Sequence, residues 1–202
     1  SLILVKNMET KEEIRERALK SRAEIEKADR RAAERVILER LVQEDFYADA
    51  RCVYCYSSFR DEVGTSGIIE ESLKQGKRVA APRVVGRRRM EFFFIKSRAD
   101  LRPGAWNIPE PGPWCAKAPL PDEKSLVILP GAAFDRSGAR IGYGRGFYDA
   151  YLKGNDRCRK AALAFGVQCV DKIPTEAHDI RADYIITEKE LIICSQDYPE
   201  TR

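Results

Sequence analysis

The stretch Leu126-Val-Ile-Leu-Pro-Gly131 (LVILPG) decides the fold class of this chain. Four consecutive apolar residues that end at Pro-Gly are typical of a strand buried on both faces, as in the centre of a parallel sheet. The carboxyl end of such a strand opens into a loop, and in α/β sheets these loops carry the ligand. We therefore predict that residues 126–129 form a central strand of an α/β fold.

The segments around this strand alternate between strand and helix patterns. A helical pattern at residues 67–75 ends at Gly76, and strand patterns occupy residues 51–57, 78–84, 90–95, 160–166 and 182–187. Such alternation is typical of a layered βα fold. We therefore predict a three-layer α/β/α architecture with a mainly parallel central sheet.

The first fifth of the chain has the pattern of helices. Thr10-Lys-Glu-Glu13 and Ser21-Arg-Ala-Glu24 both fit a capping box, in which a Ser or Thr side chain and a Glu three residues later satisfy the first free N–H groups of a helix. Apolar residues recur behind these boxes at helical spacing. The sequence therefore predicts two N-terminal helices, or one kinked helix.

Size and charge restrict the functional class. The 202 residues suit one globular domain over residues 1–202, and 36 basic against 32 acidic residues give a net charge of only +4. This near-balance argues against a nucleic-acid surface. No apolar run approaches the roughly 18 residues that span a bilayer, and the apolar residues 2–5 are too few for a signal sequence. We expect a cytoplasmic protein that binds neither nucleic acid nor a membrane.

The six cysteines are expected to be reduced thiols. A chain of this length without a secretory signal does not need disulfides. Cys52-Val-Tyr-Cys55 has the spacing of a redox or zinc motif, but in a strand the two sulfur atoms would point to opposite faces of the sheet. No second cysteine or histidine pair completes a zinc site, so we expect buried core thiols here.

The segment Gly142-Tyr-Gly-Arg-Gly-Phe-Tyr-Asp149 has the features of a phosphate-binding loop. Its alternate glycines allow positive φ angles and close approach of a ligand, and the residues that follow predict a short helix. Arg145 and Arg140 supply positive charge, and Asp149 supplies an oxygen ligand for Mg²⁺. The loop matches neither a Walker A motif nor a dinucleotide motif. A tight turn with Asp149 at the helix start is the alternative interpretation.

The sequence offers no clear protein nucleophile or base. The one histidine, His178, precedes an aspartate in a loop, where a structural hydrogen-bonding role is expected. No Gly-x-Ser-x-Gly elbow is present. This pattern favours phosphoryl transfer, in which positioning and neutralisation of charge do most of the work.

With these motifs in view, the chain resembles the 5-formyltetrahydrofolate cyclo-ligase family, also called methenyltetrahydrofolate synthetases. The resemblance covers most of the length. It rests on these segments, in order: Lys11-Glu-Glu-Ile-Arg15, Asp61-Glu62, Trp106-Asn-Ile-Pro-Glu-Pro111, Leu129-Pro-Gly-Ala-Ala-Phe-Asp135, Arg140–Asp149, His178-Asp179 and Ala182–Thr187.

The resemblance implies an enzyme that uses ATP and Mg²⁺ to convert 5-formyltetrahydrofolate to 5,10-methenyltetrahydrofolate, with release of ADP and phosphate. The formyl oxygen would be phosphorylated, and N10 of the folate would then close the ring. Because the substrate supplies both nucleophiles, no catalytic triad is needed. We expect a monomer or a weak homodimer.

The resemblance also implies roles for particular residues. Arg145 and Lys11 would be catalytic, and Asp149 and Asp183 would bind Mg²⁺. Glu62, Trp106 and Tyr148 would contact the folate. The residues expected to bind ATP are Lys11, Arg15, Arg140, Gly142, Tyr143, Gly144, Arg145, Gly146, Phe147, Tyr148 and Asp149.

The sequence departs from the family pattern at two places. Phe147 replaces a common tyrosine, and Ala132-Ala133 is smaller than the usual pair, which predicts an enlarged pocket floor.

Two other functions remain as alternatives. One is a non-catalytic nucleotide- or RNA-binding relative on the same fold. The other is an isomerase or acyl-transferase with Glu62 or Asp135 as its base.

Overall fold

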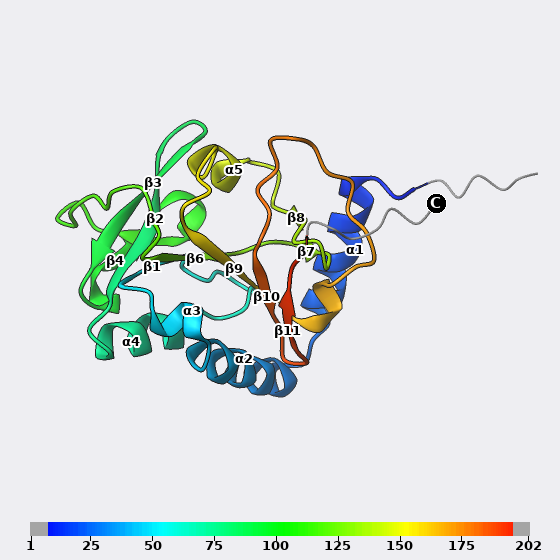
Figure 1. Ribbon diagram of the computed structural model, residues 1–202, viewed down its shortest axis with the longest axis horizontal. Coiled ribbons are helices and arrows are strands. Elements are labelled where there is room, and N and C mark those ends of the chain that lie inside the picture. Colours follow the sequence, from blue (N-terminus) through cyan, green and yellow to red (C-terminus); the bar gives the residue numbers. More distant parts are fainter. Residues whose placement is uncertain (1–7, 196–202) are drawn as a thin grey trace, which may run out of the picture.

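The computed structural model describes residues 8–195 (Figure 1), so residues 2–5 lie outside it. None of the helices in the described part is both long and apolar enough to cross a bilayer. The α-helices are α1 (Lys11–Ala23), α2 (Lys27–Val42), α3 (Asp45–Ala48), α4 (Ser66–Lys74) and α5 (Phe147–Tyr151). The strands are β1 (Cys52–Cys55), β2 (Arg78–Gly86), β3 (Arg89–Ile95), β4 (Leu101–Pro103), β5 (Pro109–Pro111), β6 (Ser125–Leu129), β7 (Ala133–Phe134), β8 (Arg140–Ile141), β9 (Arg159–Leu163), β10 (Tyr184–Ile186) and β11 (Leu191–Ile193).

Seven strands form one mixed sheet, in the order β11-β10-β9-β6-β1-β2-β3. The predicted central strand is at its middle: β6 pairs in parallel with β1 and β9, and all five of its residues are buried. Parallel pairs also join β1 to β2 and β9 to β10, whereas the outer strands β3 and β11 are antiparallel to their neighbours. The predicted mainly parallel α/β sheet is therefore confirmed.

The two faces of the sheet are covered differently. Helices α2, α3 and α4 lie along one face (Figure 1) and pack on residues such as Val53 and Ile128. The other face carries Tyr54 and Val127 and is covered by α5 and by irregular segments. Cys55 belongs to the first cluster, while Cys52 packs against the second. The two sulfur atoms thus point to opposite faces, and all six cysteines are free thiols.

One of the two predicted capping boxes is confirmed. The Glu13 N–H donates to Thr10 Oγ1 (3.2 Å), and the Thr10 N–H donates to Glu13 Oε2 (2.8 Å), so α1 begins after Thr10. The box at Ser21 is wrong, because α1 continues to Ala23 and includes it. Helix α2 begins after Glu26, whose side chain makes no capping hydrogen bond.

This difference predicts the effect of two matched substitutions. Thr10→Ala should lower the free energy of unfolding by about 1 kcal/mol, because it removes the side-chain acceptor for a free N–H group. Ser21→Ala, inside the same helix, should change it by less than about 0.5 kcal/mol, because alanine favours helix. Urea unfolding followed by circular dichroism measures both. Equal losses for the two variants would contradict this assignment of the cap.

Candidate functional site

A cavity of about 1010 Å³ lies where four segments meet: α1, the loop after β1, the β2–β3 hairpin and residues 142–146, which we call the glycine loop. It contains nearly every residue that the sequence suggested for a site. The predicted site residues that line it are Lys11, Arg15, Glu62, Trp106, Arg140 and all of Gly142–Asp149. Segments that are far apart in the sequence therefore form one concave surface, as expected of a ligand site.

The glycine loop has the backbone that its sequence predicts. Gly144 (φ +91°) and Gly146 (φ +69°) are in the left-handed region, which disfavours a residue with a side chain. Gly142 has little room for a side chain, because a Cβ atom there would lie 3.1 Å from Nη1 of Arg140. Gly146 directly precedes α5, the predicted short helix. The loop thus exposes main-chain groups to the cavity and leaves its surface open.

Three cationic side chains line the same cavity as this loop. Lys11 Nζ forms an ion pair with Asp179 Oδ2 (2.7 Å), and Arg15 Nε donates to the carbonyl oxygen of Gly142 (2.8 Å). The Arg145 side chain is exposed, and its guanidinium lies 3.8 Å from the centre of the Trp106 ring. Helix α1 and the glycine loop therefore bring fixed positive charge to the same part of the cavity.

Arg140 is engaged mainly with the protein itself. Its side chain is buried, and Nη1 donates to the carbonyl oxygen of Pro130 (3.0 Å). Burial lowers the pKa of the Arg140 guanidinium, although Asp149 at 3.9 Å and the nearby Tyr148 favour its charged form. Arg140 lines the cavity and also supports the base of the glycine loop.

Part of the cavity wall is apolar and aromatic, and the lining also includes the carboxylates of Glu62 and Glu110. Trp106 and Phe147 lie with their ring centres 6.2 Å apart, and Met90 and Ile108 extend this wall. Glu62 Oε2 accepts a hydrogen bond from the Phe59 N–H (2.7 Å). Burial raises the pKa of Glu62 above its usual range, although this hydrogen bond opposes the shift. The wall can therefore hold a flat ring that carries N–H donors.

Ala132 and Ala133 do not form the floor of the cavity. Both are fully buried and pack with Ile14 and Ala18 on the inner side of α1. Their small size lets this helix lie close to β7. The expectation that they enlarge the pocket floor is therefore wrong.

The two predicted magnesium ligands are not brought together in the cavity. Asp149 lines it, and both of its contacts use Oδ1, which accepts a hydrogen bond from the Ile180 N–H (2.9 Å) and lies 3.9 Å from Arg140. Asp183 lines a second, neighbouring cavity, and its Oδ2 accepts a hydrogen bond from the Lys160 N–H (2.8 Å). The role of Asp183 stays a prediction.

Of the two carboxylates considered as bases, Glu62 lines the main cavity and Asp135 does not, and His178 also lies outside its lining. Asp135 is buried, and its oxygens accept hydrogen bonds from Ser137, Ala139 and Ile173. It holds loops together and is not free to take a proton from a ligand. His178 is exposed and lies 3.2 Å from Glu176, so it has the polar contacts expected of a structural histidine.

Six charged residues of the cavity were not predicted as site residues: Lys20, Arg22, Arg60, Asp61, Glu110 and Asp179. A signal for Arg22 existed, because Lys11, Arg15 and Arg22 are spaced by four and seven residues and therefore share one face of α1. The partnership of Asp179 with Lys11 had no comparable signal, since 168 residues separate them.

Comparisons with known proteins identify the family of this chain. The model of the 5-formyltetrahydrofolate cyclo-ligase family matches residues 7–188. A mouse 5-formyltetrahydrofolate cyclo-ligase is 31% identical over 185 residues, which are 84% of this chain and 90% of the relative. The probable 5-formyltetrahydrofolate cyclo-ligase of Caenorhabditis elegans is 26% identical over 201 residues, 92% of this chain and 96% of that one.

A solved structure is similar as well. The 5,10-methenyltetrahydrofolate synthetase of Aquifex aeolicus superimposes with a TM-score of 0.77, at 27% identity, and each chain covers 95% of the other. The similarity thus extends over the sheet, the helices and the segments that form the cavity. The chain belongs to the 5-formyltetrahydrofolate cyclo-ligase family.

Proposed function

We propose that the cavity between α1 and the glycine loop is the active site of this 5-formyltetrahydrofolate cyclo-ligase. ATP and 5-formyltetrahydrofolate would bind in it side by side. One observation carries the proposal: the same cavity is lined by cations, by aromatic rings and by the carboxylate of Glu62. The phosphates of ATP need the cations, and a pterin ring needs the aromatic rings and the carboxylate.

The reaction requires a good leaving group on the formyl carbon. The formamide oxygen of the folate attacks the γ-phosphorus of ATP, and the bond to the β-phosphate oxygen breaks, which releases ADP. N10 then attacks the activated formyl carbon, its proton is lost to solvent, and inorganic phosphate leaves. The product is the cyclic 5,10-methenyl cation. Both nucleophiles belong to the substrate, so the protein mainly has to position the groups and stabilise charge.

Lys11, Arg15 and Arg145 are the residues we assign to the phosphates. Their positions support this role, because Arg145 belongs to the glycine loop, Arg15 donates to the carbonyl oxygen of Gly142 in it, and Lys11 lines the same cavity. Negative charge grows on the bridging oxygen and on the transferred phosphoryl group during the reaction. Fixed cations stabilise that charge more in a desolvated cavity than in water.

Glu62, Trp106 and Tyr148 are the residues we assign to the folate. An ionised carboxylate can accept hydrogen bonds from the amino and the ring N–H groups of a pterin with both of its oxygens, whereas protonation turns one oxygen into a donor. The rings of Trp106 and Tyr148 border the same cavity and can pack against the flat ring system.

Asp149 fits a magnesium ion that accompanies the nucleotide. Its carboxylate is partly exposed in the cavity, and Oδ2 has no hydrogen-bond or ion-pair partner among residues 8–195. A hard cation prefers such an oxygen ligand together with phosphate oxygens. When bound, Mg²⁺ neutralises part of the phosphate charge.

The proposal is tested by mixing the purified protein with ATP, Mg²⁺ and 5-formyltetrahydrofolate. We expect the near-ultraviolet absorbance of the methenyl product to appear, with one ADP formed per product. Omission of ATP should abolish the signal. A folded protein that binds nucleotide but forms no methenyl product would instead support the non-catalytic alternative.

The same proposal covers the domain organisation, the cellular compartment and the oligomeric state of the enzyme. We propose one catalytic domain in the cytoplasm, as a monomer or a weak homodimer. The six free thiols are consistent with a reducing compartment. Sedimentation across a range of protein concentrations measures the oligomeric state.

A further inference from the structure

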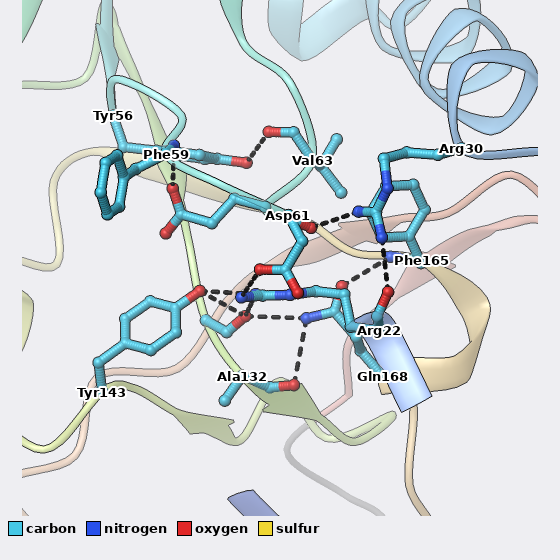
Figure 2. A network of polar contacts seen from close by, with 12 residues as sticks. Arg22, Arg30, Tyr56, Phe59, Asp61, Val63, Ala132, Tyr143, Phe165 and Gln168 are labelled. Carbon is cyan, nitrogen blue, oxygen red and sulfur yellow. Dashed lines mark hydrogen bonds and ion pairs between the residues drawn. The ribbon is translucent and has the colours of Figure 1, made fainter. Parts of the chain in front are cut away.

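Arg22 is a buried cation at the centre of the cavity wall. It lies in the last turn of α1, and only 5% of its surface is exposed. Nη2 donates to Asp61 Oδ1 (2.9 Å), and Nη1 donates to the hydroxyl of Tyr143 (2.7 Å). Figure 2 shows the guanidinium between these two side chains. Both terminal nitrogens are therefore already engaged with protein groups.

The two partners of Arg22 come from different segments that line the cavity. Asp61 directly precedes Glu62, which we assign to the folate, and Tyr143 lies within the glycine loop, which we assign to the phosphates. Arg22 itself shares α1 with Lys11 and Arg15. One guanidinium thus joins all three segments that carry the proposed binding residues.

The surrounding contacts fix this junction in place. Arg30 donates to the main-chain oxygens of both Arg22 (2.6 Å) and Asp61 (2.5 Å), and its guanidinium lies over the ring of Phe165 (Figure 2). Gln168 Nε2 donates to the carbonyl oxygen of Gly131 (2.9 Å), toward which Tyr143 also points its hydroxyl (3.4 Å). Such a network specifies the positions of its members and allows little movement.

A buried ion pair is weak evidence for a gain in stability, because desolvation of the two charges offsets much of their attraction. The side chain of Asp61 is nevertheless 32% exposed, so this pair also reaches the space where substrates would bind. The pair is therefore better explained by what it positions than by what it adds to folding.

We propose that Arg22 is a positioning residue for the cyclo-ligase reaction, which holds Tyr143 and Asp61 so that the glycine loop and Glu62 face the same pair of substrates. The inference rests on the proposed function of the cavity. It adds a residue that contacts neither substrate in this scheme and acts through its two partners.

Arg22 also affects the pKa of Glu62 through its positive charge. The ionisable groups that face Glu62 are Arg22 from α1, Tyr143 from the glycine loop, the adjacent Asp61, Tyr56 next to β1 and Tyr148 from α5. Burial raises the pKa of Glu62, and the positive charge of Arg22 opposes that rise. Removal of this charge should raise the pKa further. Since ionised Glu62 is the form that binds, the acid limb of the activity profile should then move to higher pH.

The test compares Arg22→Met, Arg22→Lys and Arg17→Met with the unchanged protein. Arg17 is the matched control, because it lies on the same helix but pairs with Glu9 on the surface, outside the cavity. We expect Arg22→Met to lower kcat/KM for 5-formyltetrahydrofolate by about tenfold and to raise KM for ATP, with the acid limb at higher pH. Arg22→Lys should move the acid limb of the pH–activity profile back toward its original pH, because it restores the positive charge. Arg17→Met should match the unchanged protein.

Tyr143→Phe provides a second variant that only removes a hydroxyl group. Because Arg22 and Tyr143 share a contact, the double variant Arg22→Met/Tyr143→Phe should lose less than the sum of the two single losses. Fully additive losses, or an Arg22→Met enzyme with unchanged kinetics and pH profile, would overturn the inference. Absence of methenyl product from the unchanged protein would instead reject the proposed function itself.

Discussion

Arg145→Ala should lower kcat by about 100- to 1,000-fold while it changes the binding of 5-formyltetrahydrofolate far less. The reason is that Arg145 is the exposed cation of the glycine loop, and the charge that it stabilises grows on the transferred phosphoryl group. An interaction made mainly in the transition state affects turnover, whereas uniform binding affects KM. Steady-state kinetics and direct measurement of folate binding separate the two effects.

The contact between Arg145 and Trp106 calls for two controls. The guanidinium lies 3.8 Å from the ring centre, so its removal also changes a surface that we assign to the folate. Arg145→Lys keeps the charge but alters the stacking, and it should retain more turnover than alanine does. Arg88→Ala removes an exposed arginine at the tip of the β2–β3 hairpin and should have no effect. Equal losses of turnover and folate binding in Arg145→Ala would show that Arg145 does not act on the phosphates.

Asp149→Asn should lower activity by about 100-fold at low millimolar Mg²⁺, and added Mg²⁺ should restore part of it. The substitution removes the negative charge that we assign to the cation, yet the amide oxygen can still accept the hydrogen bond from Ile180. The fold should therefore be unchanged, and the magnesium concentration that gives half-maximal rate should rise. Titration of the initial rate with Mg²⁺ at saturating ATP measures this shift. Addition of EDTA should stop the unchanged enzyme.

Comparison with Asp183→Asn shows which of the two carboxylates binds magnesium. The resemblance to the family implies that Asp183 is also a magnesium ligand, but its carboxylate accepts a hydrogen bond from Lys160 and lines the neighbouring cavity. The geometry favours Asp149, so the half-maximal magnesium concentration should move much less with Asp183→Asn than with Asp149→Asn. An equal shift in both variants would mean that the two carboxylates act on one ion, and a shift in Asp183→Asn alone would contradict the assignment to Asp149.

The elements that the sequence predicted are those whose signal is local. Residues 126–129 form the buried centre of β6 because a continuous apolar run leaves no polar face for solvent. Gly76 follows α4 with a φ angle of +80°, which glycine tolerates best. The false capping box at Ser21 marks the limit of such rules, because the preceding helix already satisfied the backbone around that residue.

The candidate site was predicted where its residues are contiguous or belong to a recognised motif. The glycine loop and the Lys11–Arg15 pair are of this kind. The junction at Arg22 could not be predicted, because Arg22, Asp61 and Tyr143 meet only after α1 has packed against β7 and the neighbouring loops. Trp106 adopts a left-handed backbone (φ +53°), and nothing in its sequence neighbourhood requires that conformation. Such features depend on tertiary packing, and no local sequence pattern predicts them.

A crystal structure with a magnesium complex of a non-hydrolysable ATP analogue and 5-formyltetrahydrofolate would test the central claim most directly. We predict that the terminal phosphate lies within hydrogen-bonding distance of the main-chain N–H groups of residues 142–146, with Arg145 turned toward it and the formyl oxygen adjacent. A nucleotide bound elsewhere, with residues 142–146 contacting neither substrate, would contradict the account.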